Sequence, residues 1–76
     1  MIDEKPPVVV VWRKSKTAAR KYMTVFEGYH VDAVLQEKRN PLLDNKYEID
    51  EVGVGSRFID DWLFKYSINK YNKVKK

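Results

Sequence analysis

The sequence offers few side chains with the spacing that catalysis requires. His30 is the single histidine and cysteine is absent, so no nucleophile–histidine pair has a second candidate for support. The adjacent acids at residues 50–51 and 60–61 would point in different directions on a strand or a helix, which argues against a ready Mg²⁺ site. Asp32 and residues 44–46 have the residue types of a metal-dependent nuclease, at a spacing that common residues reach by chance. We therefore predict a protein without enzymatic activity, catalytic residues, metal or cofactor.

A glycine-containing segment at residues 52–56 precedes an amphipathic stretch. Backbone N–H groups at the start of a helix attract anions, and Ser56 and Arg57 stand where they would assist. Phe58 replaces the last glycine of a dinucleotide-binding motif, and the Lys-Ser/Thr ending of a phosphate-binding loop is missing. A tight turn is the favoured interpretation, and Ser56 and Arg57 are retained as an expected anion contact.

The most informative feature is a basic segment at residues 13–21. It holds five basic residues and no acid, and it is flanked by Trp12 and Tyr22. Lysine and arginine neutralise phosphates, and exposed aromatic rings stack on unpaired bases. The segment predicts nucleic-acid binding with little sequence specificity, through Trp12, Arg13, Lys14, Lys16, Arg20, Lys21 and Tyr22. The alternative without a binding function is that the basic side chains only solvate a surface loop and that the two aromatic residues belong to the core.

A second hypothesis is a protein-interaction module, such as an inhibitor, an accessory subunit or a homo-oligomer. Residues 47–61 carry five acids against one arginine, and residues 62–76 carry five lysines and no acid. Alternating charged blocks suit docking on a complementary partner or on a second copy. The apolar run at residues 8–11, if it formed an edge strand, could pair with another chain.

These residues must be positioned by a small number of elements. The β-branched run at 8–12, with its aromatic end, predicts a buried strand. Residues 47–54 predict another strand, and the shift in the parity of its apolar positions indicates a bulge near Asp50 and Glu51. Residues 21–26 favour a strand that turns at Gly28, because its residue types are poor helix formers. Residues 29–35 are then expected to return as a strand, with a short helix from Asp32 to Arg39 as the competing interpretation.

The C-terminal part predicts a helix from about Arg57 to Asn69 or Tyr71, with Ser56 as its N-cap. Its apolar positions form one stripe that should face a sheet: Phe58, Ile59, Trp62, Leu63 and Tyr66. Together the elements indicate an α+β fold, with a three- or four-stranded, mostly antiparallel sheet packed by one C-terminal helix. A βααβα arrangement is the alternative.

Length and composition set the remaining expectations. With 76 residues, the chain should form a single domain, with a lead-in at 1–7 and a frayed basic tail at 72–76. Its longest aliphatic run, residues 8–11, is too short to cross a bilayer, and the N-terminus lacks the features of a signal peptide. A small chain without disulfides favours a reducing compartment, so we expect a cytoplasmic protein without membrane association.

Overall fold

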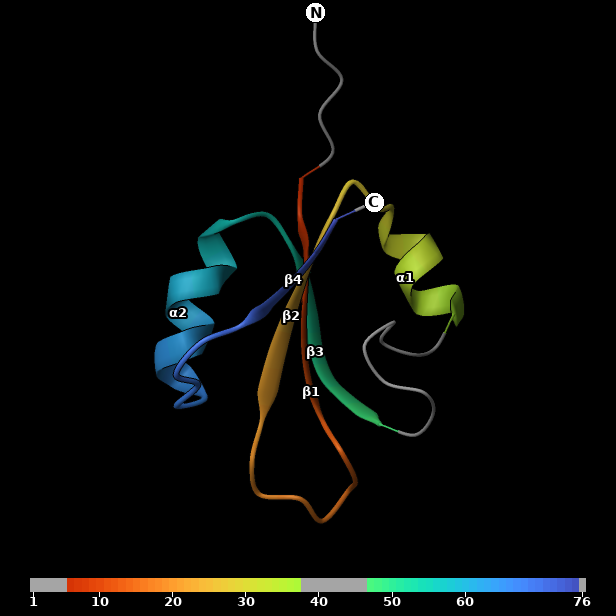
Figure 1. Cartoon of the computed structure of the whole chain (residues 1–76). Helices are drawn as coiled ribbons and strands as arrows, with labels where there is room; N and C mark the ends of the chain where they lie inside the picture. The colour runs from red at the N-terminus through yellow and green to blue at the C-terminus, as the bar shows by residue number, and fades with distance from the viewer. Residues whose placement is uncertain (1–5, 38–46, 76) are drawn as a thin grey trace, which may run out of the picture.

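The computed structural model describes residues 6–37 and 47–75, and within them it has four strands and two helices (Figure 1). Residues 1–5 of the predicted lead-in, Asp44 and the predicted helix end at Arg39 lie outside the described residues. The elements in chain order are β1 (Val8–Arg13), β2 (Tyr22–Glu27), α1 (Val31–Glu37), β3 (Glu48–Val54), α2 (Arg57–Lys65) and β4 (Asn72–Lys75).

The strands form one mixed sheet in the order β3-β1-β2-β4. β1 pairs antiparallel with both β2 and β3, whereas β4 runs parallel to β2. The run at 8–12 is therefore central, and the idea that it forms an exposed edge is wrong. A strand that is buried on both faces needs apolar side chains in both directions, and this explains the unbroken β-branched run.

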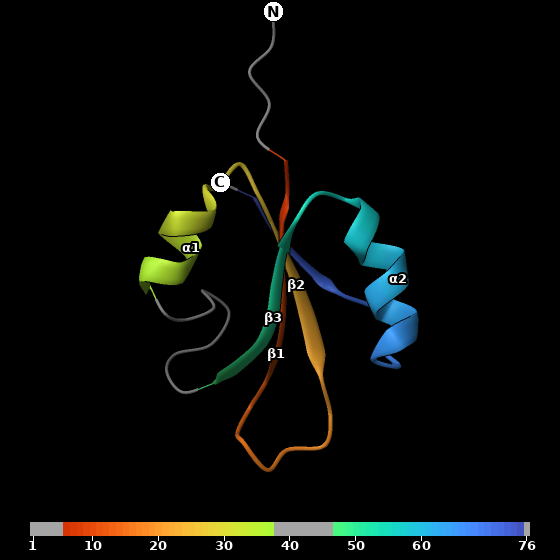
Figure 2. The same ribbon diagram turned by 180° about the vertical axis from the view of Figure 1, so that it is seen from behind.

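The sheet is covered by one helix on each face, so the fold has three layers (Figures 1 and 2). On the α1 face, Val34 packs with Val8, Val10 and Phe26. On the α2 face, Trp62 packs against the residues that alternate with these: Val9, Val11, Met23 and Val25. The α+β class, the strand assignments for β1–β3 and the apolar stripe of α2 are confirmed. The expectation of a single covering helix, and the βααβα alternative, are wrong.

The segment after Gly28 forms α1, in agreement with the competing prediction of a short helix, and the favoured prediction of a returning strand is wrong. Gly28 has a φ of 86°, which turns the chain away from the sheet, and the Val34 N–H then donates to the His30 carbonyl (3.2 Å). Val31 and Val34, three residues apart, place their side chains over the apolar face of β1 and β2. The strand positions beside β1 and β2 are taken by β3 and β4, so this segment covers the sheet face.

The bulge predicted in the third strand is present at Asp50. Glu51 pairs with Val11 and Ile49 pairs with Trp12, so Asp50 is the extra residue between them. The bulge brings Ile49 to the face of the sheet that Val52 shares, which accounts for the parity shift in the sequence.

The tail that was predicted to fray is strand β4, which pairs with β2 from Asn72↔Thr24 to Lys75↔Glu27. The predicted helix also ends early, at Lys65 instead of residue 69 or 71. These two corrections belong together, because the chain must leave the helix early enough to reach the edge of β2. Neither of the two described helices has the length and apolar character needed to span a membrane.

A Schellman motif ends α2. The Ile68 N–H donates to the Leu63 carbonyl (2.8 Å), and the Ser67 N–H donates to the Phe64 carbonyl (3.2 Å). Ser67 has a φ of 56°, a conformation that glycine adopts without cost and other residues do not.

The Ser67→Gly substitution should therefore stabilise the protein, by about 0.5–1 kcal/mol once the entropy that glycine gains in the unfolded chain is subtracted. Urea denaturation followed by circular dichroism measures the change. Ser56→Gly is the matched control, because Ser56 has a φ of −71° and gains nothing from glycine. A Ser67→Gly variant that is less stable than the wild type would contradict the strain at this position.

Candidate nucleic-acid interface

The basic segment forms most of the hairpin connection between β1 and β2, at the end of the sheet opposite the N-terminal end of α2 (Figure 1). We call residues 14–21 the basic hairpin. Lys14, Lys16 and Arg20 are exposed, and none of them has an ion pair with an acid among the described residues. These three cations are therefore available to a ligand.

The other two basic residues of the segment are engaged within the protein. Asp50 accepts a hydrogen bond from the Lys21 ammonium, and its second oxygen lies 3.3 Å from Nε of Arg13. All three side chains are half-buried or more, so the carboxylate compensates much of the charge of both cations. Arg13 and Lys21 thus join β1, β2 and β3, and the prediction that they bind nucleic acid has no support in this geometry.

Trp12 cannot stack on a base, because it belongs to the core. Only 3% of its surface is exposed, and its indole N–H donates to the Thr24 hydroxyl (2.9 Å). Its ring stacks on Tyr22 with the centroids 4.6 Å apart, and it meets Tyr47 edge-on at 6.1 Å. The prediction of Trp12 as a binding residue is therefore wrong. The indole needed an internal acceptor when it was buried, and Thr24 supplies one.

Tyr22 also has a different role from the one predicted. Trp12 covers one side of its ring, and the charged ends of Lys14 and Arg20 lie 5.6 and 5.5 Å from its centroid. These distances fall within the range of a cation–π interaction. Tyr22 therefore positions cations, and it offers no uncovered face on which a base would stack.

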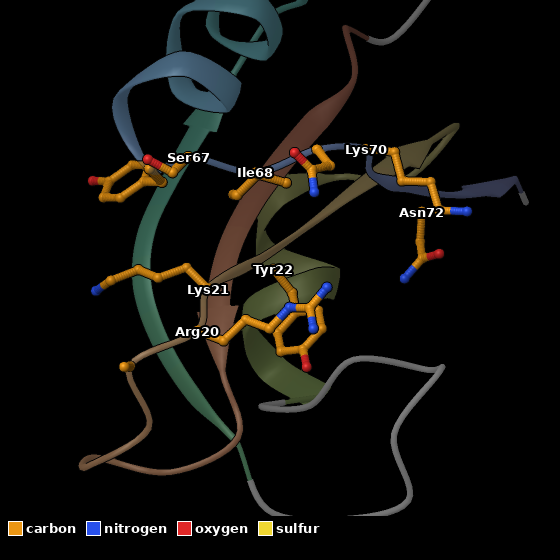
Figure 3. A pocket seen from close by; sticks show the side chains of 10 residues that line it. Arg20, Lys21, Tyr22, Ser67, Ile68, Lys70 and Asn72 are labelled. Carbon is orange, nitrogen blue, oxygen red and sulfur yellow. The ribbon is translucent and has the colours of Figure 1, made fainter.

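A hollow of about 690 Å³ opens beside the basic hairpin, between the start of β2 and the connection from α2 to β4 (Figure 3). Its lining combines cationic, amide, hydroxyl and aromatic side chains, and no acidic residue is part of it. The lining residues are Ala19, Arg20, Lys21, Tyr22, Tyr66, Ser67, Ile68, Asn69, Lys70 and Asn72. The sequence predicted Arg20, Lys21 and Tyr22 at a site, and it missed the contribution of residues 66–72.

The hollow exists because β4 is shorter than β2. The pairing of β4 begins at Asn72, opposite Thr24, so the first residues of β2 have no β4 residue beside them. The left-handed residue Ser67 directs the chain from α2 toward this gap, and Lys70 follows three residues later. The sequence signal for this arrangement was the cluster of C-terminal lysines, whose place beside β2 depends on the parallel pairing.

A second tyrosine on the wall of the hollow repeats the arrangement at Tyr22. The ammonium groups of Lys21 and Lys65 lie 5.7 and 5.1 Å from the centroid of Tyr66. Lys65 also lies 3.7 Å from a carboxylate oxygen of Glu51. Cations therefore lie close to both of the tyrosine rings that line the hollow.

The expected anion contact at Ser56 and Arg57 lies at the other end of the sheet, away from the basic hairpin (Figure 1). Ser56 is the N-cap residue of α2, as predicted, but it has helical backbone angles and its side chain makes no capping hydrogen bond. The guanidinium of Arg57 lies 5.2 Å from the centroid of Phe58. Both residues are exposed, and they do not join the basic surface.

The residues considered for catalysis lie only partly within the described part of the chain. His30 and Asp32 are exposed at the start of α1, and Asp44 is not among the residues described. Within the described part of the chain, no group of three or more histidine, cysteine, aspartate or glutamate residues could hold a metal ion. Comparison of the chain with protein-family models, with curated proteins and with solved structures found no match.

Proposed function

We propose that this protein binds nucleic acid without catalysing a reaction, through the exposed cations of the basic hairpin together with Lys70. The observation that carries the proposal is the convergence of two segments far apart in the sequence. Arg20, from the hairpin, and Lys70, from the connection between α2 and β4, line the same hollow. Lys14 and Lys16 extend this positive surface over the hairpin.

Phosphate contacts dominate this mode of binding. Trp12 is buried and Tyr22 is covered by Trp12 and by two cations, so the site presents charge instead of stacking platforms. Both faces of the sheet are also covered by helices (Figures 1 and 2). No described helix with base-reading side chains adjoins the hairpin, so we expect similar affinity for unrelated sequences.

The acidic block is compatible with this proposal. Asp50 forms ion pairs with Arg13 and Lys21, and Glu51 lies near Lys65. Asp60 and Asp61 belong to α2. The negative charge of these four acids is therefore partly compensated or carried on another element, and the fifth acid, Glu48, lies opposite Arg13 in the sheet.

A salt titration tests the proposal. If Lys14, Lys16, Arg20 and Lys70 each contact a phosphate of duplex DNA, the logarithm of the binding constant should fall with the logarithm of salt with a slope of about −3.6. Replacing Lys14 and Lys16 by Gln should flatten the slope to about −1.8 and weaken binding to every sequence. Fluorescence anisotropy with a labelled duplex of random sequence measures both quantities.

The matched control replaces Lys73 and Lys75 by Gln. These two lysines are exposed, two residues apart and carried on β4, so the change in net charge is the same. The control should keep a slope near that of the wild type. Equal weakening in the two variants, or no binding by the wild type at low ionic strength, would refute nucleic-acid binding through the hairpin.

A further inference from the structure

The hollow beside β2 has the chemistry of an anion site. Three cations line it and no acidic residue does, and the side chains of Asn69 and Asn72 add N–H donors at its rim. Figure 3 shows Lys70 and Asn72 extending from one side, and Arg20 lying against the ring of Tyr22 on the other. Hydrogen bonds between such groups and an oxyanion are charge-assisted, and they are stronger than those between neutral groups.

The cations that line the hollow differ in whether they already form an ion pair with an acidic residue. Lys21 is paired with Asp50 and lies near the Tyr66 ring, and in Figure 3 it extends away from Arg20. Arg20 and Lys70 have no acid partner among the described residues. The uncompensated charge of the hollow is therefore that of Arg20 and Lys70.

The Tyr22 ring restricts Arg20 before any ligand binds. The guanidinium lies 5.5 Å from the ring centroid, and the ring itself is fixed by stacking on the buried Trp12. Ordering a long, flexible side chain normally costs binding free energy. Part of that cost is met during folding, so Arg20 is preorganised.

We propose that the hollow is a phosphate-binding subsite, in which Arg20 and Lys70 bind one phosphate group and the amides of Asn69 and Asn72 donate to its remaining oxygens. A volume of about 690 Å³ accepts one phosphate group, whether it belongs to a mononucleotide or to a nucleic-acid backbone whose bases stay outside the hollow. The tyrosine rings already carry cations, so the subsite recognises the phosphate and leaves the base unread. The inference rests on the proposed function for its assumption that the phosphate belongs to a nucleic acid.

Titration with inorganic phosphate at constant ionic strength tests the subsite directly, with ¹H–¹⁵N correlation spectra as the readout. We expect saturable shifts concentrated at residues 20–22 and 67–72. Arg20→Gln and Lys70→Gln should each weaken phosphate binding about tenfold, the effect of losing one charge-assisted contact. Lys75→Gln removes the same charge from an exposed position outside the hollow, and it should leave the affinity within about twofold of the wild type.

The tyrosine provides a test that does not depend on charge. Tyr22→Phe keeps the aromatic ring beside Arg20 and should retain the wild-type affinity for phosphate, whereas Tyr22→Leu should weaken it several-fold. A thermal melt of each variant verifies that the fold is retained. Shifts that do not saturate, or an equal loss in Lys75→Gln and Arg20→Gln, would overturn the subsite.

The same proteins separate the subsite from the proposed function and identify the source of the phosphate. If phosphate fails to bind while duplex DNA binds through Lys14 and Lys16, the subsite is wrong and the proposed function stands. If phosphate binds in the hollow and no nucleic acid binds, the proposed function is wrong and small phosphorylated molecules are the ligands. Tighter binding of a single-stranded oligonucleotide with a 5′-phosphate than of the same strand without it would assign the hollow to terminal phosphates.

Discussion

The Trp62→Ala substitution should cost about 3–5 kcal/mol, the range for a large aromatic residue removed from a core. Trp62 is only 7% exposed, and it is the buried residue of α2. It packs on the α2 face of β1 and β2, together with the half-buried Phe58 and Tyr66. A core of this size supplies about 3–5 kcal/mol in total, so the variant should be largely unfolded at room temperature. Circular dichroism with urea titration measures the loss.

Phe64→Ala is the matched control on the same helix. Its side chain is 89% exposed, and substitutions at such positions change stability by about 0.5 kcal/mol or less. A cooperative melt of Trp62→Ala close to that of the wild type would place this tryptophan outside the core. A large loss in Phe64→Ala would show that α2 packs with a different face against the sheet.

Gly53→Ala should destabilise the protein by about 1–3 kcal/mol, because any side chain at this position would overpack the contact between β3 and α2. A Cβ atom at Gly53 would lie 2.8 Å from Cδ2 of Phe58 and 3.0 Å from Cη2 of Trp62. Gly53 therefore allows α2 to approach β3 closely, which brings its aromatic residues onto the sheet. The midpoint of urea denaturation measures this effect.

A double-mutant cycle tests the cause. Phe58→Leu removes the ring atoms that a new Cβ would meet, so Gly53→Ala should cost less in that background, with a coupling of about 0.5–3 kcal/mol. An equal cost of Gly53→Ala in both backgrounds would show that the glycine serves another purpose than close packing.

The basic segment of this protein has two separate roles that its sequence does not distinguish. Arg13 and Lys21 share the carboxylate of Asp50, which compensates one of their two positive charges and links β1, the start of β2 and β3. Lys14, Lys16 and Arg20 remain exposed on the hairpin. Counting basic residues therefore overestimates the charge that a ligand meets, and a variant that removes Arg13 and Lys21 would leave Asp50 without its partners. The titration above avoids this difficulty in its test variant, because Lys14 and Lys16 have no ion pair with a described acid, whereas its control removes the ion pair of Lys73 with Glu27.

The sequence by itself determined the elements whose signal is local. The β-branched run of β1 and the apolar stripe of α2 are periodic patterns that packing reinforces, so both were predicted. The bulge at Asp50 was visible as a shift of parity, because side chains on a strand alternate with a period of two. The charge of the basic hairpin also followed directly from composition.

Only the tertiary structure decided the features that depend on distant partners. Residues 31–37 had no strand position to occupy, since β3 and β4 take the places beside β1 and β2, so they became a helix. The lysine-rich tail became a strand because the edge of β2 offers it backbone partners. The same pairing places Lys70 on the wall of the hollow that Arg20 also lines, and burial of Trp12 removes the ring expected to stack on bases. Such placements arise from backbone hydrogen bonding and burial across the whole sheet, which no local pattern of residues encodes.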